Sequence, residues 1–150
     1  MQNEPNTEPE DVKSTREAAD RGGAQRIQFK GLRRYWSDKA VWSFDIIFDL
    51  DGFLKQYPQF TDSLTAESIV GEKSMFNEIA AGCDPQAEVS AVAGVLAYLM
   101  YFQETDEQIE SFQALVDDPL SQYEQFFVSS GKEESTPLEQ DWMIMSIEAV

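Results

Sequence analysis

The chain has 150 residues, 42% of them hydrophobic, and its 28 acidic and 11 basic residues give a net charge of −17. One cysteine and no histidine exclude an internal disulfide and Ser-His or Cys-His catalysis, and leave almost no ligands for zinc. Because phosphate repels carboxylate, we expect no direct binding of nucleic acid or of a membrane.

The length and the apolar content predict a single folded domain. No apolar run is long enough to cross a bilayer, and the first residues do not resemble a secretory signal. The lone Cys83 fits a reducing compartment, so we expect a cytoplasmic protein. Residues 1–25 are polar and contain Gly22-Gly23, which predicts a disordered acidic tail before one domain over residues 26–150.

A short basic segment begins the predicted domain and is interleaved with aromatic residues. Its bases are Arg26, Lys30, Arg33, Arg34 and Lys39. Two interpretations compete: the segment packs against the acidic helices of its own chain, or it stacks on and neutralises a nucleic acid. We favour the first, because a strongly acidic protein would have to hold phosphate against its own field.

Residues 37–57 fit two secondary structures. Ser37 can cap a helix that Pro58 would stop, whereas Phe44, Ile46 and Phe48 alternate with polar residues as in a strand. We favour the helix, because a lone strand has no obvious partner, although residues 26–32 could supply one. Shorter helices are expected over residues 65–70 and 74–81.

Four helix starts follow in the second half. Asp84-Pro85 and Asp118-Pro119 each place a capping acceptor before proline, and Thr105-x-x-Gln108 and Thr136-x-x-Glu139 read as capping boxes. The first start predicts a buried central helix over residues 85–103, and the second a helix that ends near Val116. The last predicted helix has four apolar residues on one face: Leu138, Trp142, Met145 and Ala149.

The predicted fold class is therefore all-α: a compact bundle of about five or six helices around residues 85–103, after the tail. An α+β fold with a small β element in residues 26–50 remains the alternative.

One short motif suggests an enzyme. Residues 46–52 read Ile-Ile-Phe-Asp-Leu-Asp-Gly, which resembles the first motif of haloacid-dehalogenase-type phosphatases. The resemblance implies a phosphoryl-accepting nucleophile at Asp49, a general acid at Asp51 and a bound Mg²⁺. Phe53 stands where that family has threonine, and the helical remainder of the chain gives its later motifs no context.

The second half concentrates negative charge, since residues 84–150 hold 14 acids and one base. Six of the acids lie on or beside two successive predicted helices: Asp106, Glu107, Glu110, Asp117, Asp118 and Glu124. Like charges three or four residues apart on a helix repel one another, so their retention suggests a use. We predict a non-catalytic interaction protein without a cofactor, which presents these carboxylates to a basic protein surface. A nucleic-acid-mimicking inhibitor of a nucleic-acid-binding protein or nuclease, or an immunity-type protein, is the concrete form; the Mg²⁺-dependent phosphatase is the alternative.

Overall fold

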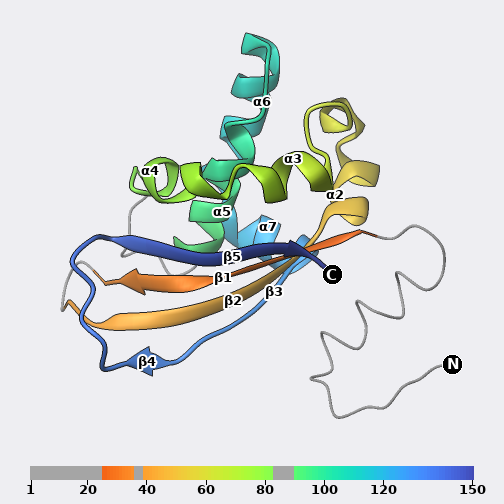
Figure 1. The fold of residues 1–150 in the computed structure, drawn as a ribbon. Coiled ribbons are helices and arrows are strands. Elements are labelled where there is room, and N and C mark those ends of the chain that lie inside the picture. The colour runs from red at the N-terminus through yellow and green to blue at the C-terminus, as the bar shows by residue number, and fades with distance from the viewer. Residues whose placement is uncertain (1–24, 36–38, 83–89) are drawn as a thin grey trace, which may run out of the picture.

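The computed structural model describes residues 25–35, 39–82 and 90–150, so the predicted tail lies outside it except for Gln25. An antiparallel sheet and a layer of helices make up this part of the chain (Figure 1). The strands are β1 (Arg26–Arg34), β2 (Val41–Asp49), β3 (Phe127–Ser130), β4 (Glu133–Glu134) and β5 (Trp142–Ala149). Their order is β3-β2-β1-β5, and β4 pairs with β2. The prediction of an all-α bundle is therefore wrong: the fold is α+β.

The first half of the sheet is the hairpin β1–β2, in which Arg26 faces Asp49 and Arg34 faces Val41. Ile27 and Phe29 of β1 are fully buried, and so are Ile46 and Phe48 of β2, because alternate side chains of a strand point to the same face. The helix favoured for residues 37–57 is thus wrong over Val41–Asp49, and residues 37 and 38 lie outside the described chain. The strand was not alone, since the basic segment supplies its partner.

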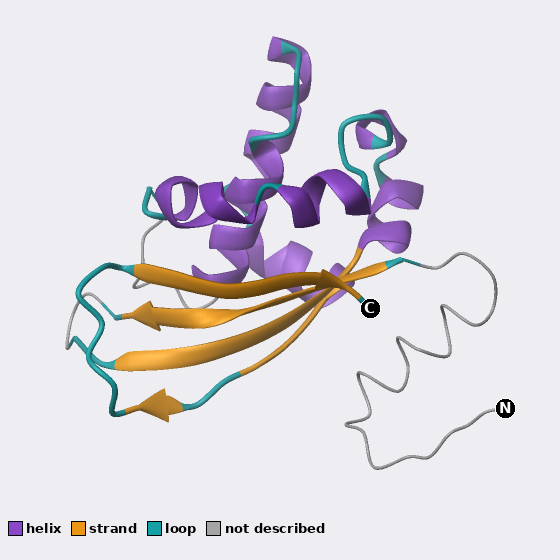
Figure 2. Ribbon diagram, in the orientation of Figure 1, coloured by secondary structure: helices purple, strands orange, loops and turns teal. Residues whose placement is uncertain are grey.

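The helices all cover one face of the sheet, and the other face carries none of them (Figure 2). They are α2 (Leu50–Gln56), α3 (Ala66–Gly71), α4 (Phe76–Ala80), α5 (Ser90–Met100), α6 (Asp106–Val116) and α7 (Pro119–Phe126), with 3-10 turns at Pro58–Phe60 and Lys73–Met75. The predicted helices over residues 65–70 and 74–81 correspond to α3 and to the second 3-10 turn followed by α4. The capping of α3 by Thr65 accounts for its start, since the hydroxyl accepts from Ser68 N at 3.1 Å.

The predicted central helix over residues 85–103 is confirmed as α5, although residues 85–89 of that prediction lie outside the described chain. Val95, Leu96 and Leu99 of α5 are almost completely buried in the core shared with the sheet. Gly94 marks a close approach between α5 and a strand. A Cβ on Gly94 would lie 2.8 Å from the ring of Trp142 in β5.

The predicted last helix is wrong, because residues 142–149 form β5. Trp142 and Ile147 are buried, whereas Met145 is 59% exposed. The pairing of β5 with β1 shifts register between Lys30 and Gly31, so that β5 has one extra residue there. Met145, which the predicted helical face included, is this extra residue and is exposed, so the apolar spacing that suggested a helix does not mark one buried face.

None of the described helices combines the length and the apolar character needed to cross a lipid bilayer. The cytoplasmic compartment stays a prediction.

Candidate functional site

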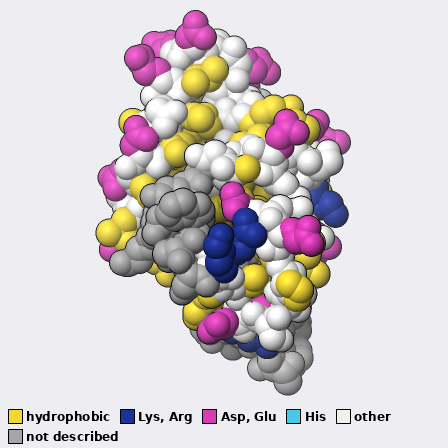
Figure 3. Space-filling view, turned by 90° about the vertical axis from the view of Figure 1, so that its left-hand side faces the viewer, with side chains coloured by type: hydrophobic (Ala, Val, Ile, Leu, Met, Phe, Trp, Pro, Cys, Tyr) yellow, Lys and Arg dark blue, Asp and Glu magenta, His cyan; other side chains and the backbone are white. Residues whose placement is uncertain are grey.

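The six acids singled out in the sequence all lie at the surface. Asp106, Glu107 and Glu110 belong to α6, Asp117 and Asp118 form the junction to α7, and Glu124 belongs to α7. Figure 3 shows acidic side chains gathered at the top of the molecule, which is the end where Figure 1 places α6, and no Lys or Arg among them in this view.

The outward face of α6 carries four of these carboxylates. With about 100° of rotation per residue, Asp106, Glu110 and Asp117 fall within about 40° of one another around the helix, and Glu107 lies about 60° further. Phe112 is fully buried on the opposite side, where its ring meets that of Phe60 at a centroid distance of 4.9 Å. Asp106, Glu107, Glu110 and Asp117 are called the α6 acidic face below.

The other two predicted acids do not join that face. Asp118 precedes Pro119 at the start of α7, but its side chain makes no capping hydrogen bond, so the predicted cap is present only in position. Glu124 lies opposite the buried Gln122 and Phe126 on α7, a helix that packs close to β3 while α6 lies farther from the sheet (Figure 1). The structure therefore divides the predicted array into the α6 acidic face and two separate acids.

The start of α6 is fixed by the capping box that the sequence predicts. Thr105 Oγ1 accepts from Gln108 N at 3.1 Å, and Gln108 Oε1 accepts from Thr105 N at 3.2 Å. Gln108 also donates through Nε2 to Gln59 O at 3.3 Å, which ties the first turn to the neighbouring segment. Asp106 and Glu107 lie in this first turn, where the helix dipole favours negative charge.

No base neutralises the α6 acidic face from within its own part of the chain, because no Lys or Arg occurs between Lys73 and Lys132. Gln113 Nε2 donates a hydrogen bond to Asp117 Oδ1 at 3.0 Å, but this amide carries no charge that would neutralise the carboxylate. Glu110 lies four residues after Asp106 and three after Glu107, which places like charges beside each other on the helix. The face thus keeps its negative charge uncompensated along the helix.

The basic segment makes contacts within its own chain, but the prediction that it packs against the acidic helices is wrong, because its acidic partners come from a strand and a loop. Arg26 pairs with Asp49 at 3.1 Å, and Arg34 pairs with Asp141 at 3.1 Å. Arg33 is buried and lies 4.0 Å from the centre of the Tyr35 ring. Much of the positive charge of β1 therefore serves contacts within the chain.

The two carboxylates of the phosphatase-like motif have structural contacts. Asp49 caps α2, since its Oδ1 accepts from Gly52 N at 2.9 Å, and it also pairs with Arg26. Asp51 Oδ2 accepts from Gln25 N at 2.8 Å. The strand before them belongs to an antiparallel sheet. Among the residues with described positions, no three Asp, Glu or Cys side chains are grouped as a metal site.

Sequence reasoning missed one feature: a cavity of about 340 Å³ whose lining comes from β1, β2, β3, α5 and α7. No local pattern could have revealed it, because its walls are brought together by pairings between distant segments.

Comparisons of the chain with protein-family models, with curated proteins and with solved structures found no match. The functional argument therefore depends on the residues themselves.

Proposed function

We propose that this protein is a non-catalytic interaction protein that occupies a basic site on a partner protein through the α6 acidic face. The observation that carries the proposal is the arrangement of that face: four exposed carboxylates on one side of a helix, with no base within the 58 residues from Ser74 to Gly131. A surface that needed charge only for solubility would gain stability from interleaved Lys or Arg.

Apolar side chains beside the acids give such a surface something to bury. Ile109 in α6 is 40% exposed, and Leu120 in α7 is 49% exposed. Protein interfaces combine a small apolar centre with a polar rim, and charge complementarity sets the rate of encounter and the choice of partner. The acids would thus steer the partner, while the apolar groups would hold it.

The partner class follows from the geometry of the charges. From Asp106 to Asp117 the helix rises about 16 Å, which is about the rise of five nucleotides along one DNA strand. A site that binds phosphates along a nucleic acid would meet carboxylates over a similar length. The site on a nucleic-acid-binding protein or nuclease is therefore the partner surface we propose, and the protein would inhibit by occupying it.

Two triple variants test the proposal. The first replaces three acids of the α6 acidic face, Asp106 with Asn and Glu107 and Glu110 with Gln. The second replaces three exposed acids elsewhere with Gln: Glu133 in β4, Glu139 in the loop after it and Glu148 in β5. Both raise the net charge by three. The wild-type protein first captures partners from the native cell extract at low salt, and the affinity of a captured protein is then measured for all three chains.

We expect the first variant to bind the captured partner at least about tenfold more weakly than the wild type, mainly through a slower association. The second variant should bind like the wild type. Binding of the wild type should weaken as salt rises, because exposed charges are screened beyond about 8 Å at 0.15 M. Equal binding by the two variants would refute the proposal, since the effect would then depend on net charge alone.

A further inference from the structure

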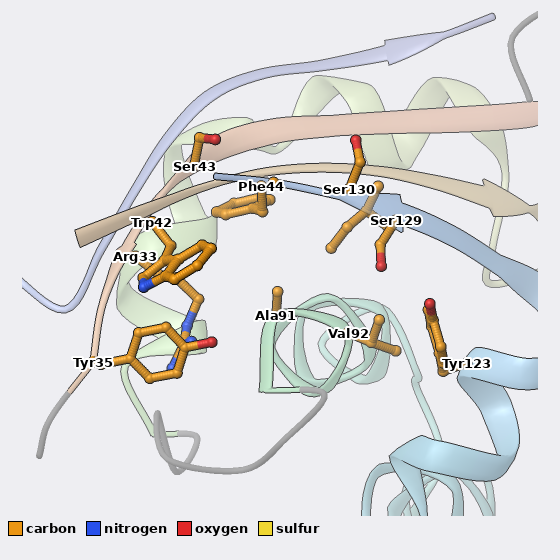
Figure 4. Close-up of a pocket in the computed structure, with 12 residues that line it drawn as sticks. Arg33, Tyr35, Trp42, Ser43, Phe44, Ala91, Val92, Tyr123, Ser129 and Ser130 are labelled. Carbon is orange, nitrogen blue, oxygen red and sulfur yellow. The ribbon is translucent and has the colours of Figure 1, made fainter. Parts of the chain in front are cut away.

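The cavity between the sheet and the helices is a second candidate binding site, and its lining differs chemically from the α6 acidic face. Figure 4 shows Trp42 and Phe44 of β2 on the sheet side and Ala91 and Val92 of α5 opposite them. Ser129 of β3 and Tyr123 of α7 close one end, and Tyr35 closes the other. The cavity exists because Ala91 and Ser129 are too small to fill the space between the two layers.

One end of the cavity is held by an aromatic cluster. Tyr35 N donates to Ala40 O at 2.7 Å, and Tyr35 O accepts from Lys39 N at 2.9 Å. The Tyr35 ring meets the Trp42 ring edge to face at 6.1 Å, and the Arg33 guanidinium lies 4.0 Å from the centre of the Tyr35 ring. Backbone and ring contacts therefore fix the position of Tyr35 before any ligand arrives.

The rim near β3 is fixed by the backbone as well. Ser43 N donates to Lys132 O at 2.8 Å, and Lys132 N donates to Ser43 Oγ at 3.1 Å. Gly131 lies so close to β2 that an added Cβ would clash with Ser43 O. This close approach requires glycine, and it sets where β3 ends beside the cavity.

The lining combines aromatic rings and hydroxyl groups with one cation, the guanidinium of Arg33, which lies against the Tyr35 ring. The hydroxyls of Tyr123 and Ser129 point toward each other at one end, and the Tyr35 hydroxyl is turned toward the space (Figure 4). The described residues that line the cavity include no Asp or Glu, although the chain has 28 of them. The two other described pockets each include acidic residues. The chemistry of this cavity is thus aromatic and hydroxylic rather than acidic.

We propose that this cavity binds a small planar aromatic molecule that carries hydroxyl groups. A flat ring fits between Phe44 and Val92 and can meet the edge of Trp42, an arrangement that aromatic pairs prefer. Substituent oxygens at its two ends would exchange hydrogen bonds with the hydroxyls of Tyr35, Tyr123 and Ser129. The volume of about 340 Å³ lies in the range of small-molecule sites.

The test titrates the full-length protein with 4-hydroxybenzyl alcohol, followed by ligand-observed NMR, and with its saturated-ring analogue 4-(hydroxymethyl)cyclohexanol. We expect saturable binding of the aromatic alcohol with a dissociation constant of about 1 mM or lower, as suits a ligand of about nine non-hydrogen atoms. The saturated analogue should bind about tenfold more weakly, because it cannot stack. Non-saturable binding, or equal binding of both probes, would overturn the proposal.

Three variants locate the binding. Ala91→Leu fills the cavity and should weaken binding at least about tenfold, whereas Ala114→Leu makes the same change on the exposed side of α6 and should leave it unchanged. Tyr123→Phe keeps the shape but removes one hydroxyl, and should weaken binding about fivefold. Melting curves establish that each variant is folded. Equal affinity of Ala91→Leu and Ala114→Leu would place the ligand elsewhere and refute the assignment.

Discussion

The outer face of the sheet and the outer face of α6 use charge in opposite ways. On the sheet, acidic side chains of β2 have partners on β1: Arg26 pairs with Asp49, and the neutral Gln28 donates to Asp45 at 2.9 Å. On α6, four carboxylates share one side of a helix and no base lies near them in sequence. The two faces thus differ in whether their carboxylates have partners on a neighbouring element.

The comparison distinguishes charged side chains that stabilise the fold through pairing from charged side chains that make no such pair. Paired charges across strands add a little stability and help to fix the register of the hairpin. The acids of α6 contribute no such pairing, and their mutual repulsion slightly opposes helix formation. A protein with a single cause for its acidity, such as solubility, would not be expected to divide its charges in this way.

The largest expected effect concerns the buried side of the sheet. Trp142 joins β5 to α5 through its contact with Gly94, and Trp142→Ala should cost about 3–5 kcal/mol of unfolding free energy. Ile109→Ala on α6 should cost about 1 kcal/mol or less, because that side chain is already 40% exposed. Denaturant unfolding of both variants measures the contrast. Similar losses would mean that α6 is as deeply integrated as the sheet.

A smaller effect is expected inside the helical layer. The hydroxyl of Tyr98, buried in α5, donates to Ile69 O in α3, so Tyr98→Phe should cost about 1 kcal/mol at neutral pH. Burial, with smaller contributions from the charge of Glu72 and from Tyr101, raises the pKa of Tyr98 above its ordinary value of 10.0. Folding therefore favours the protonated hydroxyl.

The raised pKa gives this prediction a pH signature. Above pH 10 the unfolded chain gains stability by ionising Tyr98, whereas the folded chain keeps the proton, so the wild type loses about 1.4 kcal/mol per pH unit from this group. Tyr98→Phe lacks that loss. The stability advantage of the wild type should shrink above pH 10 and vanish near about pH 11. A constant difference across this range would show that the hydroxyl is not buried as described.

The smallest expected effects are the changes in stability when one paired acid and one unpaired acid are each neutralised. Asp141→Asn weakens the ion pair with Arg34 and should lower stability by about 0.5 kcal/mol. Glu110→Gln relieves repulsion with Asp106 and Glu107, and should raise stability by a few tenths of a kcal/mol, roughly 0.2–0.5. The opposite signs, measured by denaturant unfolding at low salt, sharpen the comparison. A loss of stability in Glu110→Gln would show that this carboxylate has a structural partner.

The sequence by itself determined the features that depend on neighbouring residues. Thr105 and Gln108 form a capping box within one turn, so the start of α6 and its end near Val116 could be predicted. The apolar girth of α5 likewise predicted a buried helix. The uneven distribution of charge along the chain was visible as well, because it requires only a count of acidic and basic residues. The six candidate acids are all exposed, but only the structure shows that four of them share one face of α6 and that Asp118 and Glu124 do not.

Tertiary structure decided everything that depends on a partner far along the chain. β5 pairs with β1 more than a hundred residues earlier, and the bulge opposite Lys30 and Gly31 hides its strand alternation. In β2, Ile47 is buried on the outer side of the sheet, so the pattern of apolar residues does not alternate cleanly there either. Local patterns report the environment of a residue only when its neighbours in sequence create that environment. Strands, ion pairs between strands and the aromatic cavity are created by distant segments, so only the folded chain could reveal them.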